Sequence, residues 1–394
     1  MPERIVYLDN NGTTQMDETV RQAVDQAETL YGNASSMHGL GRDAEMVIEI
    51  ARKQVASLID CTHGRIVFTS GASESNNTVF NIFRDRIDDK VDGRDRIVTT
   101  TIEHPSIIET VKYLRKKGYK IDECPVDHEG RVKMDELRKL MGPDVALVSV
   151  MTGNNEVGTI QPIAEIAKMA HACGAYMHTD ATQAIGKIPV TMEAWGVDYL
   201  SLSGHKFYGP KGVGVLAVSK NAPYCPFLHG GHQEHGMRAG TYNTADIVGI
   251  GAAAELAEKN LKDEHDRLWH LREMLRKGIV AAVPDVVVNG PSKAEDCLPG
   301  TLDMSFPCAE GESILLYLDL EGIEVSTGSA CASGSLEPSY VLLACGIDVE
   351  LAHGSIRFSF GRYNTEEDVK YVLEKLPPII AKIRKMSTRK LPNE

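Results

Sequence analysis

Polar side chains that could do chemistry recur at the ends of short apolar runs in the first half of the chain. In order, these runs are followed by Gly71-Ala-Ser-Glu-Ser-Asn-Asn77, His104, Asn154-Asn155, Asp180 with Gln183, and Ser203-Gly-His-Lys206. In an open α/β sheet, ligands bind beyond the carboxyl ends of the strands, so we expect these side chains to meet at one edge. The turn at 71–77 enters a helix whose free N–H groups could hold a phosphate, although such turns also serve only to cap helices.

A lysine and an acid among these residues match the needs of one organic cofactor. Pyridoxal phosphate requires a lysine for its Schiff base, an acid at its pyridinium nitrogen and phosphate-binding donors at a helix start. Lys206 and Asp180 supply the first two. Each residue also has an ordinary interpretation, since Asp180 could be an N-cap, Asn154-Asn155 a turn, His104 a loop residue and Lys206 a solvent-exposed side chain. Their occurrence along one rim favours the cofactor site.

One cysteine in the last third of the chain has unusual neighbours. Cys331 is flanked by Ser326-Thr-Gly-Ser-Ala330 and Ala332-Ser-Gly-Ser335, a composition that favours a loop over a core. We interpret Cys345 and Cys173 instead as packed residues. The eight cysteines contain no Cys-x-x-Cys pair, so we expect neither a disulfide framework nor a metal site.

The elements that must position these residues follow from hydrophobic periodicity. Apolar runs at 65–70, near 102, and at 149–151, 177–179, 200–203 and 214–218 alternate with helical or loop segments, which predicts βαβ units and a mostly parallel, doubly wound sheet. After about residue 245 we expect two long helices, one starting near Asp246 and one over 261–280. Alternation over 302–306 and 356–360 predicts an antiparallel, half-exposed sheet with helices on one side. Thr365-Glu-Glu-Asp368 predicts the start of the last helix.

The predicted fold class is therefore α/β, with a large domain over 15–260 and a smaller α+β domain formed by 1–14 and 261–394. Length and composition agree with two domains, since the chain has 394 residues and 42% hydrophobic content. Lys and Arg number 42 against 55 Asp and Glu, and the net charge of −13 argues against nucleic acid or an anionic membrane as partner. We expect no targeting segment, no membrane span and a cytoplasmic location.

Several longer motifs make the sequence similar to a known family. It resembles the cysteine desulfurases of class V of the fold type I pyridoxal phosphate enzymes, specifically the type that supplies sulfur for nitrogenase and iron-sulfur cluster assembly. The resemblance runs from Tyr7-Leu-Asp-Asn-Asn-Gly-Thr-Thr14 to Arg357-Phe-Ser-Phe-Gly361. Its most specific pieces are His178-Thr-Asp-Ala-Thr-Gln183, Ser203-Gly-His-Lys-Phe-Tyr-Gly-Pro-Lys-Gly212 and Ser326-Thr-Gly-Ser-Ala-Cys-Ala-Ser-Gly-Ser-Leu-Glu-Pro-Ser-Tyr340.

The resemblance implies a role for each matching residue. At the cofactor ring, Lys206 would be the Schiff-base lysine, Asp180 would pair with the pyridinium nitrogen, Gln183 and Asn155 would lie near the ring hydroxyl, and His104 would stack on the ring. The phosphate would be bound by Ser73, Ser203 and His205, joined by Thr241 of the other subunit of a homodimer. The substrate carboxylate would be held by Arg357 and Asn155. Cys331 would be the nucleophile, with His104 as proton donor or acceptor. The implied reaction converts L-cysteine to L-alanine and leaves a persulfide on Cys331 for an iron-sulfur scaffold or another acceptor protein.

The sequence departs from the usual pattern of the family at a few positions. Gly12 stands for a common alanine, Ala34 for a proline, His232 for a glycine, His235 for an arginine and Ala239 for a serine. None of these is an assigned catalytic group. The alternatives are another class V enzyme, such as an aminotransferase or a selenocysteine lyase, and a non-catalytic sulfur-assembly scaffold. The Cys331 segment disfavours a simple aminotransferase, and the intact lysine, aspartate and cysteine disfavour a scaffold.

Overall fold

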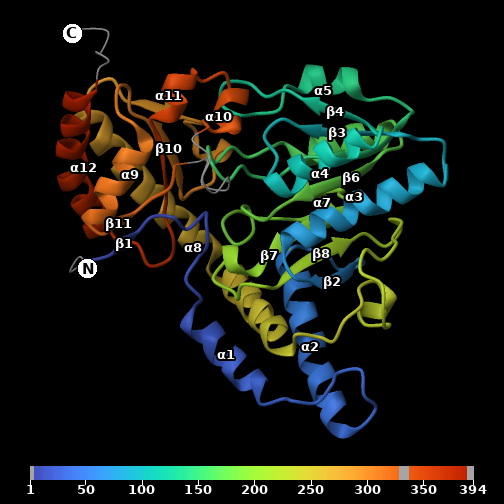
Figure 1. Cartoon of the computed structure of the whole chain (residues 1–394). Helices are drawn as coiled ribbons and strands as arrows, with labels where there is room; N and C mark the ends of the chain where they lie inside the picture. Colours follow the sequence, from blue (N-terminus) through green and yellow to red (C-terminus); the bar gives the residue numbers. More distant parts are fainter. Residues whose placement is uncertain (1–3, 328–336, 388–394) are drawn as a thin grey trace.

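The computed structural model describes residues 4–327 and 337–387, which form two parts joined by one long helix (Figure 1). In the described ranges the main sheet has seven strands in the order β2-β8-β7-β6-β5-β3-β4. Their bounds are β2 (Arg65–Thr69), β3 (Arg96–Thr100), β4 (Lys120–Cys124), β5 (Val145–Ser149), β6 (Tyr176–Asp180), β7 (Tyr199–Ser203) and β8 (Gly214–Val218). Only β8 runs antiparallel to its neighbours, so the expected α/β fold with a mostly parallel sheet is confirmed.

Helices cover both faces of this sheet because its central strands are apolar on both sides. Every residue of β5, β7 and β8 is buried, as is typical of strands between two helical layers. On one face pack α3 (Ala72–Asp88) and α4 (Pro105–Lys116). The other face carries α2 (Gly39–Leu58), α6 (Ile163–Ala172) and the first half of α8 (Thr244–Ala282). The remaining helices of this part are α1 (Glu18–Glu28), α5 (Met134–Leu140) and α7 (Met192–Trp195).

The second part is a smaller sheet with helices on one side. Strands β9 (Val287–Asn289), β10 (Thr301–Ser305) and β12 (Ser355–Ser359) pair in the antiparallel order β12-β10-β9. Strand β1 (Val6–Tyr7) runs parallel to β11 (Ile323–Glu324), so the start of the chain joins this part. The helices here are α9 (Gly311–Leu320), α10 (Tyr340–Ala344), α11 (Val349–His353) and α12 (Glu366–Met386). Thr365 and Asp368 form the expected capping box of α12.

The structure differs from expectation in the helix that joins the two parts. We expected two helices after residue 245, but α8 is one continuous helix of 39 residues. Its first half buries Ile250 and Ala254 in the core of the larger part, and its second half buries Leu271 and Leu275 in the core of the smaller one. The residues of α8 between these two cores are mostly polar. The periodic spacing of apolar residues is therefore interrupted there, although the helix itself continues. This helix crosses residue 260, and the domain boundary expected there stays a prediction.

The smaller sheet is also buried more deeply than its alternation indicated. We expected it to be half exposed, but every residue of β10 and β12 is buried. Leu302 and Phe358 are cross-strand partners on the face that packs under the helices. The opposite face carries the cross-strand pair Asp303 and Arg357, which is polar yet buried because it turns toward the larger part and the N-terminal segment. The alternating pattern therefore belongs to a sheet with one apolar and one polar face, both of them buried.

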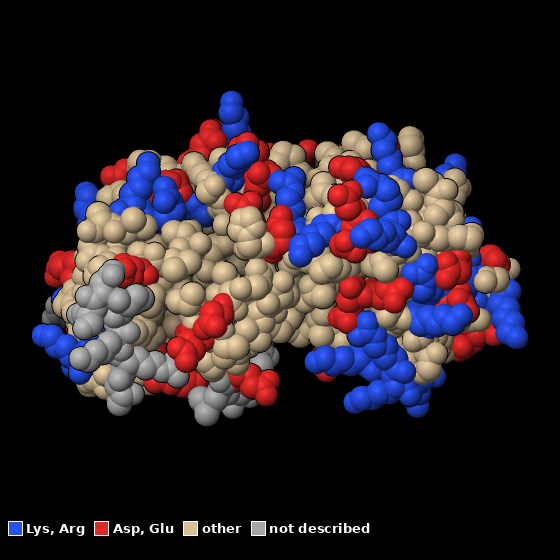
Figure 2. All heavy atoms as spheres, turned by 90° about the horizontal axis from the view of Figure 1, so that it is seen from above, with Lys and Arg blue, Asp and Glu red and all other residues tan. Residues whose placement is uncertain are grey.

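Charges of both signs are mixed on the surface seen in Figure 2, where Lys and Arg lie among Asp and Glu. Among the helices in the described ranges, none combines the length and apolar character that crossing a membrane requires. The expected cytoplasmic location stays a prediction.

Candidate active site

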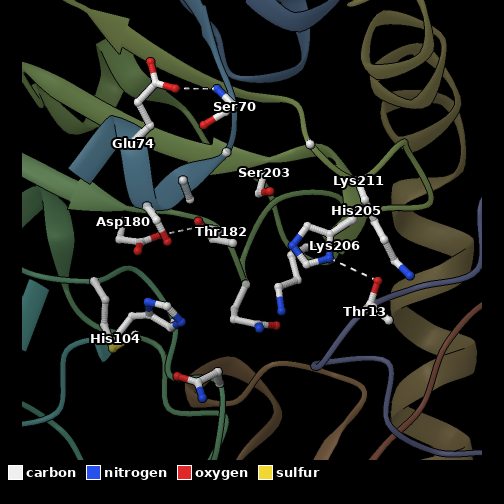
Figure 3. Close-up of a pocket in the computed structure, with 18 residues that line it drawn as sticks. Thr13, Ser70, Glu74, His104, Asp180, Thr182, Ser203, His205, Lys206 and Lys211 are labelled. Carbon is white, nitrogen blue, oxygen red and sulfur yellow. Dashed lines mark hydrogen bonds between the residues drawn. The ribbon is translucent and has the colours of Figure 1, made fainter. Parts of the chain in front are cut away.

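A cavity of about 450 Å³ lies at the edge of the main sheet where the parallel strands end (Figure 3). Segments that follow β2, β3, β5, β6 and β7 reach it, together with the start of the chain and the segment before β8. Its lining includes eight of the residues expected at the site: Ser73, His104, Asn155, Asp180, Gln183, Ser203, His205 and Lys206. Arg357 and Thr241 do not line it. Cys331 lies outside the described residues.

One end of the cavity presents unused N–H groups at a helix start. Gly71 precedes α3 with a φ of +152°, which residues with a side chain rarely adopt, and no side chain caps the first turn. Ser73 lies in that turn and contributes a hydroxyl. Ser203 lies beside it, since a Cβ built on Gly71 would sit 3.8 Å from Ser203 Oγ. This end has the donors that a phosphate group needs.

His205 completes this end as a neutral side chain. Its Nδ1 lies 3.1 Å from the Thr13 hydroxyl oxygen. Burial, with smaller contributions from the charges of Lys206 and Lys211, lowers the pKa of His205 to about 4. The imidazole is therefore uncharged near neutral pH and acts toward an anion as a hydrogen-bond donor.

Asp180 ends β6 and is held in place from two sides. Asn76 Nδ2 donates to Asp180 Oδ2 at 2.7 Å, and the Thr182 amide donates to Oδ1 at 2.9 Å. Asn76 is fully buried on α3 and also donates to Ser106 Oγ at 2.9 Å. These bonds fix the carboxylate toward the cavity. We did not single out Asn76 from the sequence, although it lies in the 71–77 turn that drew attention.

His104 begins α4 as its N-cap and offers one nitrogen to the cavity. The Ser106 amide donates to His104 Nδ1 at 3.1 Å, so the neutral ring carries its proton on Nε2. Burial lowers the pKa of His104, and the charge of Lys206 adds to this effect while Asp180 opposes it. The side chain is therefore a neutral imidazole that lies across the cavity from Lys206 (Figure 3).

Lys206 extends into the cavity from the short 3-10 helix η1 (Gly204–Lys206) after β7. Its Nζ donates to the backbone oxygens of Asn11 and Gly12, each at 2.6 Å. The amine is thus held by the N-terminal segment. Asn11 was not among the expected site residues, although it belongs to the N-terminal motif that carries part of the resemblance.

Arg357 lies behind the cavity and reaches its wall through Asn155. Arg357 Nη1 donates to the Asn155 backbone oxygen at 3.0 Å, and Nη2 pairs with Asp9 Oδ1 at 2.6 Å. The guanidinium is 4% exposed, and its Nε has no hydrogen-bond partner among residues 4–327 and 337–387. In the same ranges Asn155 Oδ1 is also buried without a partner. These two unpaired groups mark a place where a polar ligand would complete the hydrogen bonding.

Comparisons with known proteins agree with this geometry. Residues 6–372 match the family described as aminotransferase class-V. The chain belongs to the class-V aminotransferase family. It is 46% identical over 389 residues to cysteine desulfurase IscS of Dictyoglomus turgidum, covering 98% of each chain. It is 43% identical to cysteine desulfurase NifS of Azotobacter vinelandii, covering 97% of this chain and 94% of that one. A solved structure of a NifS-like protein superposes with a TM-score of 0.89 at 40% identity, covering 96% of this chain and all of that one.

The expected relationship to the cysteine desulfurases is thereby confirmed, and with it a pyridoxal phosphate enzyme. The cavity of this class-V chain fits that cofactor on its own chemistry. It combines a lysine amine, a buried carboxylate and a helix start with unused N–H groups. Thr182 Oγ1 and Asn155 Oδ1 belong to lining residues and are buried with no hydrogen-bond partner in the part of the chain that the structure describes. Orphaned polar atoms of this kind are expected where a bound polar group supplies the missing bonds.

The cysteines in the described ranges do not compete for a role in this class-V site, because none of them lines the cavity. Cys345 is buried as expected, and burial raises the pKa of its thiol to about 12. Burial likewise raises the pKa of Cys61 and Cys124 to about 11. Cys173 is only half-buried, with its Sγ 3.1 Å from the Ala170 backbone oxygen. The raised pKa values of Cys345, Cys61 and Cys124 make these three thiols poor nucleophiles.

Proposed function

We propose that the chain is a homodimeric cysteine desulfurase that converts L-cysteine to L-alanine and carries the sulfur as a persulfide on Cys331. The observation that supports this most is the convergence of Lys206, Asp180 and His104 on one cavity beside a phosphate-binding helix start. Family membership supports the same reaction class. When bound, pyridoxal phosphate supplies an electron sink for the substrate's α-carbon.

Each side chain has a task that follows from its surroundings. Lys206 would anchor the cofactor and then move the proton at the substrate's α-carbon, because it extends into the cavity directly after β7, while Lys211 lines the cavity farther along the chain. Asp180, held by Asn76 and Thr182, would keep the ring nitrogen protonated. Ser73, Ser203 and His205 would hold the phosphate, and Gln183 would meet the ring oxygen.

The substrate carboxylate is assigned to Arg357 together with Asn155. Arg357 is buried, and among the described residues its Nε has no hydrogen-bond partner, while Asn155 would contribute its side-chain N–H groups, which can donate to a carboxylate. A guanidinium fork binds a carboxylate with two parallel hydrogen bonds. Asp9 already pairs with Arg357 Nη2. The substrate carboxylate would therefore bind through Nε or displace Asp9 from Nη2.

The sulfur transfer is assigned to Cys331 and to protons handled by His104. The Cys331 thiolate would form an S–S bond to the sulfur of cysteine while the carbon–sulfur bond of the substrate breaks. The electron pair of that bond stays with the carbon, which takes a proton and becomes the methyl group of alanine. His104 would exchange that proton, and its neutral ring with the proton on Nε2 supports this role. The persulfide would then pass to an iron-sulfur scaffold or another acceptor protein.

Two features support a homodimer. Thr241 lines a second cavity, which shares Ser70 and Gly212 with the main cavity. Thr241 therefore lies near the proposed phosphate site of its own subunit but does not line it. The α1–α2 region projects from the body (Figure 1) and exposes large apolar side chains, namely Tyr31, Met37, Leu40, Met46 and Ile50. Large apolar side chains exposed together on one projecting region are typical of an interaction site. We propose that a second copy covers it and receives Thr241 at its own phosphate site.

The experiment that tests the function is Cys331→Ser in the cofactor-loaded protein. We expect the variant to bind cofactor and L-cysteine, to form alanine only at background level, and to yield no persulfide on alkylation and mass spectrometry, because a serine hydroxyl is hardly ionised at neutral pH. Cys173→Ser is the control and should retain desulfuration. Loss of activity in the control with retention in Cys331→Ser would refute the assignment, and alanine formation independent of all eight cysteines would refute the reaction.

A further inference from the structure

A second lysine lies next to the cavity without lining it. Lys187 follows β6 and is 8% exposed. Its Nζ donates to Gln183 Oε1 at 2.8 Å and to Asn11 Oδ1 at 2.9 Å. Within the described ranges no carboxylate forms an ion pair with it. None of the roles assigned above uses this amine.

The two amides that Lys187 meets are oriented independently of it. Asn11 Nδ2 donates to the backbone oxygen of Asn155 at 3.1 Å, so Asn11 Oδ1 must be the atom that faces Lys187. Gln183 Nε2 donates to the backbone oxygen of Asn11 at 2.9 Å, so Gln183 Oε1 likewise faces Lys187. Backbone oxygens only accept, which excludes the flipped amides. Lys187 is therefore required as a donor to both side-chain oxygens.

The same backbone oxygen of Asn11 accepts hydrogen bonds from Gln183 Nε2 and from Lys206 Nζ. Lys187 thus belongs to a hydrogen-bond network that includes the cavity-lining side chains of Gln183 and Lys206. With Oε1 held by Lys187 and one Nε2 hydrogen held by Asn11, Gln183 has its second Nε2 hydrogen left for a ligand in the cavity. Gln183 can then offer a ligand a donor, since its Oε1 is turned toward Lys187.

The position is costly for a lysine. Burial, reinforced by the charges of Lys206 and Arg357, lowers the pKa of Lys187 to about 7. An apolar side chain of equal length would avoid the desolvation of an amine and would fill the same volume. What the amine provides beyond packing is its pair of hydrogen bonds.

We propose that Lys187 is a positioning residue of the cofactor site, which holds Gln183 as a hydrogen-bond donor toward the ring oxygen of pyridoxal phosphate and holds Asn11 against Lys206. This inference rests on the proposed function for the role of Gln183. It extends that proposal to a residue that touches neither cofactor nor substrate.

A double-mutant cycle between Lys187→Met and Gln183→Ala tests it, with Lys168→Met on the exposed side of α6 as the matched control. Apoprotein is titrated with pyridoxal phosphate, and the dissociation constant and the absorption maximum of the bound cofactor are recorded. We expect Lys187→Met to weaken binding about fivefold to tenfold and to shift the absorption maximum, because Gln183 loses its fixed orientation. In the Gln183→Ala background, Lys187→Met should have a clearly smaller effect on both quantities, limited to what passes through Asn11. Lys168→Met should match the wild type.

Equal effects of Lys187→Met in both backgrounds, or no effect in either, would overturn the inference. Thermal unfolding of each apoprotein shows whether the variants fold, and Lys187→Gln replaces Lys187→Met in the same cycle if the latter does not. The dissociation constant and the absorption maximum of bound pyridoxal phosphate are measured without any turnover of cysteine. A chain that binds pyridoxal phosphate yet makes no alanine from cysteine would refute the proposed reaction while leaving the cycle interpretable.

Discussion

The ion pair between Arg238 and Glu74 offers the sharpest test of the phosphate end of the site. Glu74 lines the cavity in the first turn of α3, where a carboxylate would repel a phosphate. Arg238 meets it with two hydrogen bonds, Nε to Oε1 at 2.9 Å and Nη2 to Oε2 at 3.1 Å. The perturbation is Arg238→Met, which keeps the aliphatic bulk and leaves the Glu74 charge unpaired.

The magnitude follows from the burial of the two side chains. Glu74 is 9% exposed and Arg238 is 25% exposed, so the pair is screened less than a surface pair but is not fully desolvated. We take the interaction free energy of the Arg238–Glu74 pair as about 1–2 kcal/mol, which lies between the ranges for exposed ion pairs and for buried hydrogen bonds to charged groups. Since 1.4 kcal/mol is a factor of ten, the dissociation constant for pyridoxal phosphate should rise about 5- to 30-fold.

The pH dependence has a definite sign. Burial favours the neutral form of Glu74, but hydrogen bonds from Arg238 and Ser70 outweigh it and lower the pKa of Glu74. A carboxyl whose pKa is lower in the folded state stabilises the protein above its unfolded pKa of about 4.3, and this stability is lost as the pH falls through the folded value. The difference in thermal stability between the wild type and Arg238→Met should therefore be full at pH 7 and should shrink below about pH 4.

The assay is titration of apoprotein with pyridoxal phosphate for the wild type, Arg238→Met, Glu74→Gln and the double variant. Glu74→Gln in the Arg238→Met background removes the unpaired charge and should restore most of the affinity. If the double variant binds as weakly as Arg238→Met, Arg238 acts on the phosphate directly and the reasoning fails. Unchanged affinity in Arg238→Met would refute it as well.

Two further predictions concern Lys206 and Gly71. Lys206→Ala should abolish alanine formation while the apoprotein unfolds at the wild-type temperature, because a partly buried rim lysine adds little to the core; normal turnover in a coupled alanine assay would contradict its role. Gly71→Ala should destabilise the protein by about 1–3 kcal/mol in urea unfolding, since a Cβ there meets nothing closer than 3.8 Å and the cost is backbone strain at φ +152°. Gly39→Ala at the start of α2 is its control and should be neutral or stabilising.

The sequence was sufficient to predict the position of residues that lie at the end of a strand. Asp180 and Ser203 close β6 and β7, so periodicity alone indicated the edge at which they lie. Asn11 could not be placed in this way, because its contacts with Asn155 and Gln183 join parts of the chain 144 and 172 residues apart. Lys187 was equally hidden, since its neighbours in sequence are apolar or small and only the packed structure shows the two oxygens that it meets.

The buried polar face of the smaller sheet connects the proposed carboxylate-binding arginine to Ser326, which precedes Cys331 in the sequence. Arg357 on β12 exchanges both backbone hydrogen bonds with Ser326, N to O at 2.7 Å and O to N at 3.2 Å. The same arginine reaches Asn155 in the wall of the cavity. Ser326 is therefore fixed relative to the group expected to hold the substrate carboxylate, only a few residues before the proposed nucleophile. Because the bonds to Ser326 belong to the Arg357 backbone and the bond to Asn155 belongs to its guanidinium, an Arg357→Met variant should keep Ser326 in place and lose only the side-chain contacts, so a rise in the KM for cysteine would report carboxylate recognition.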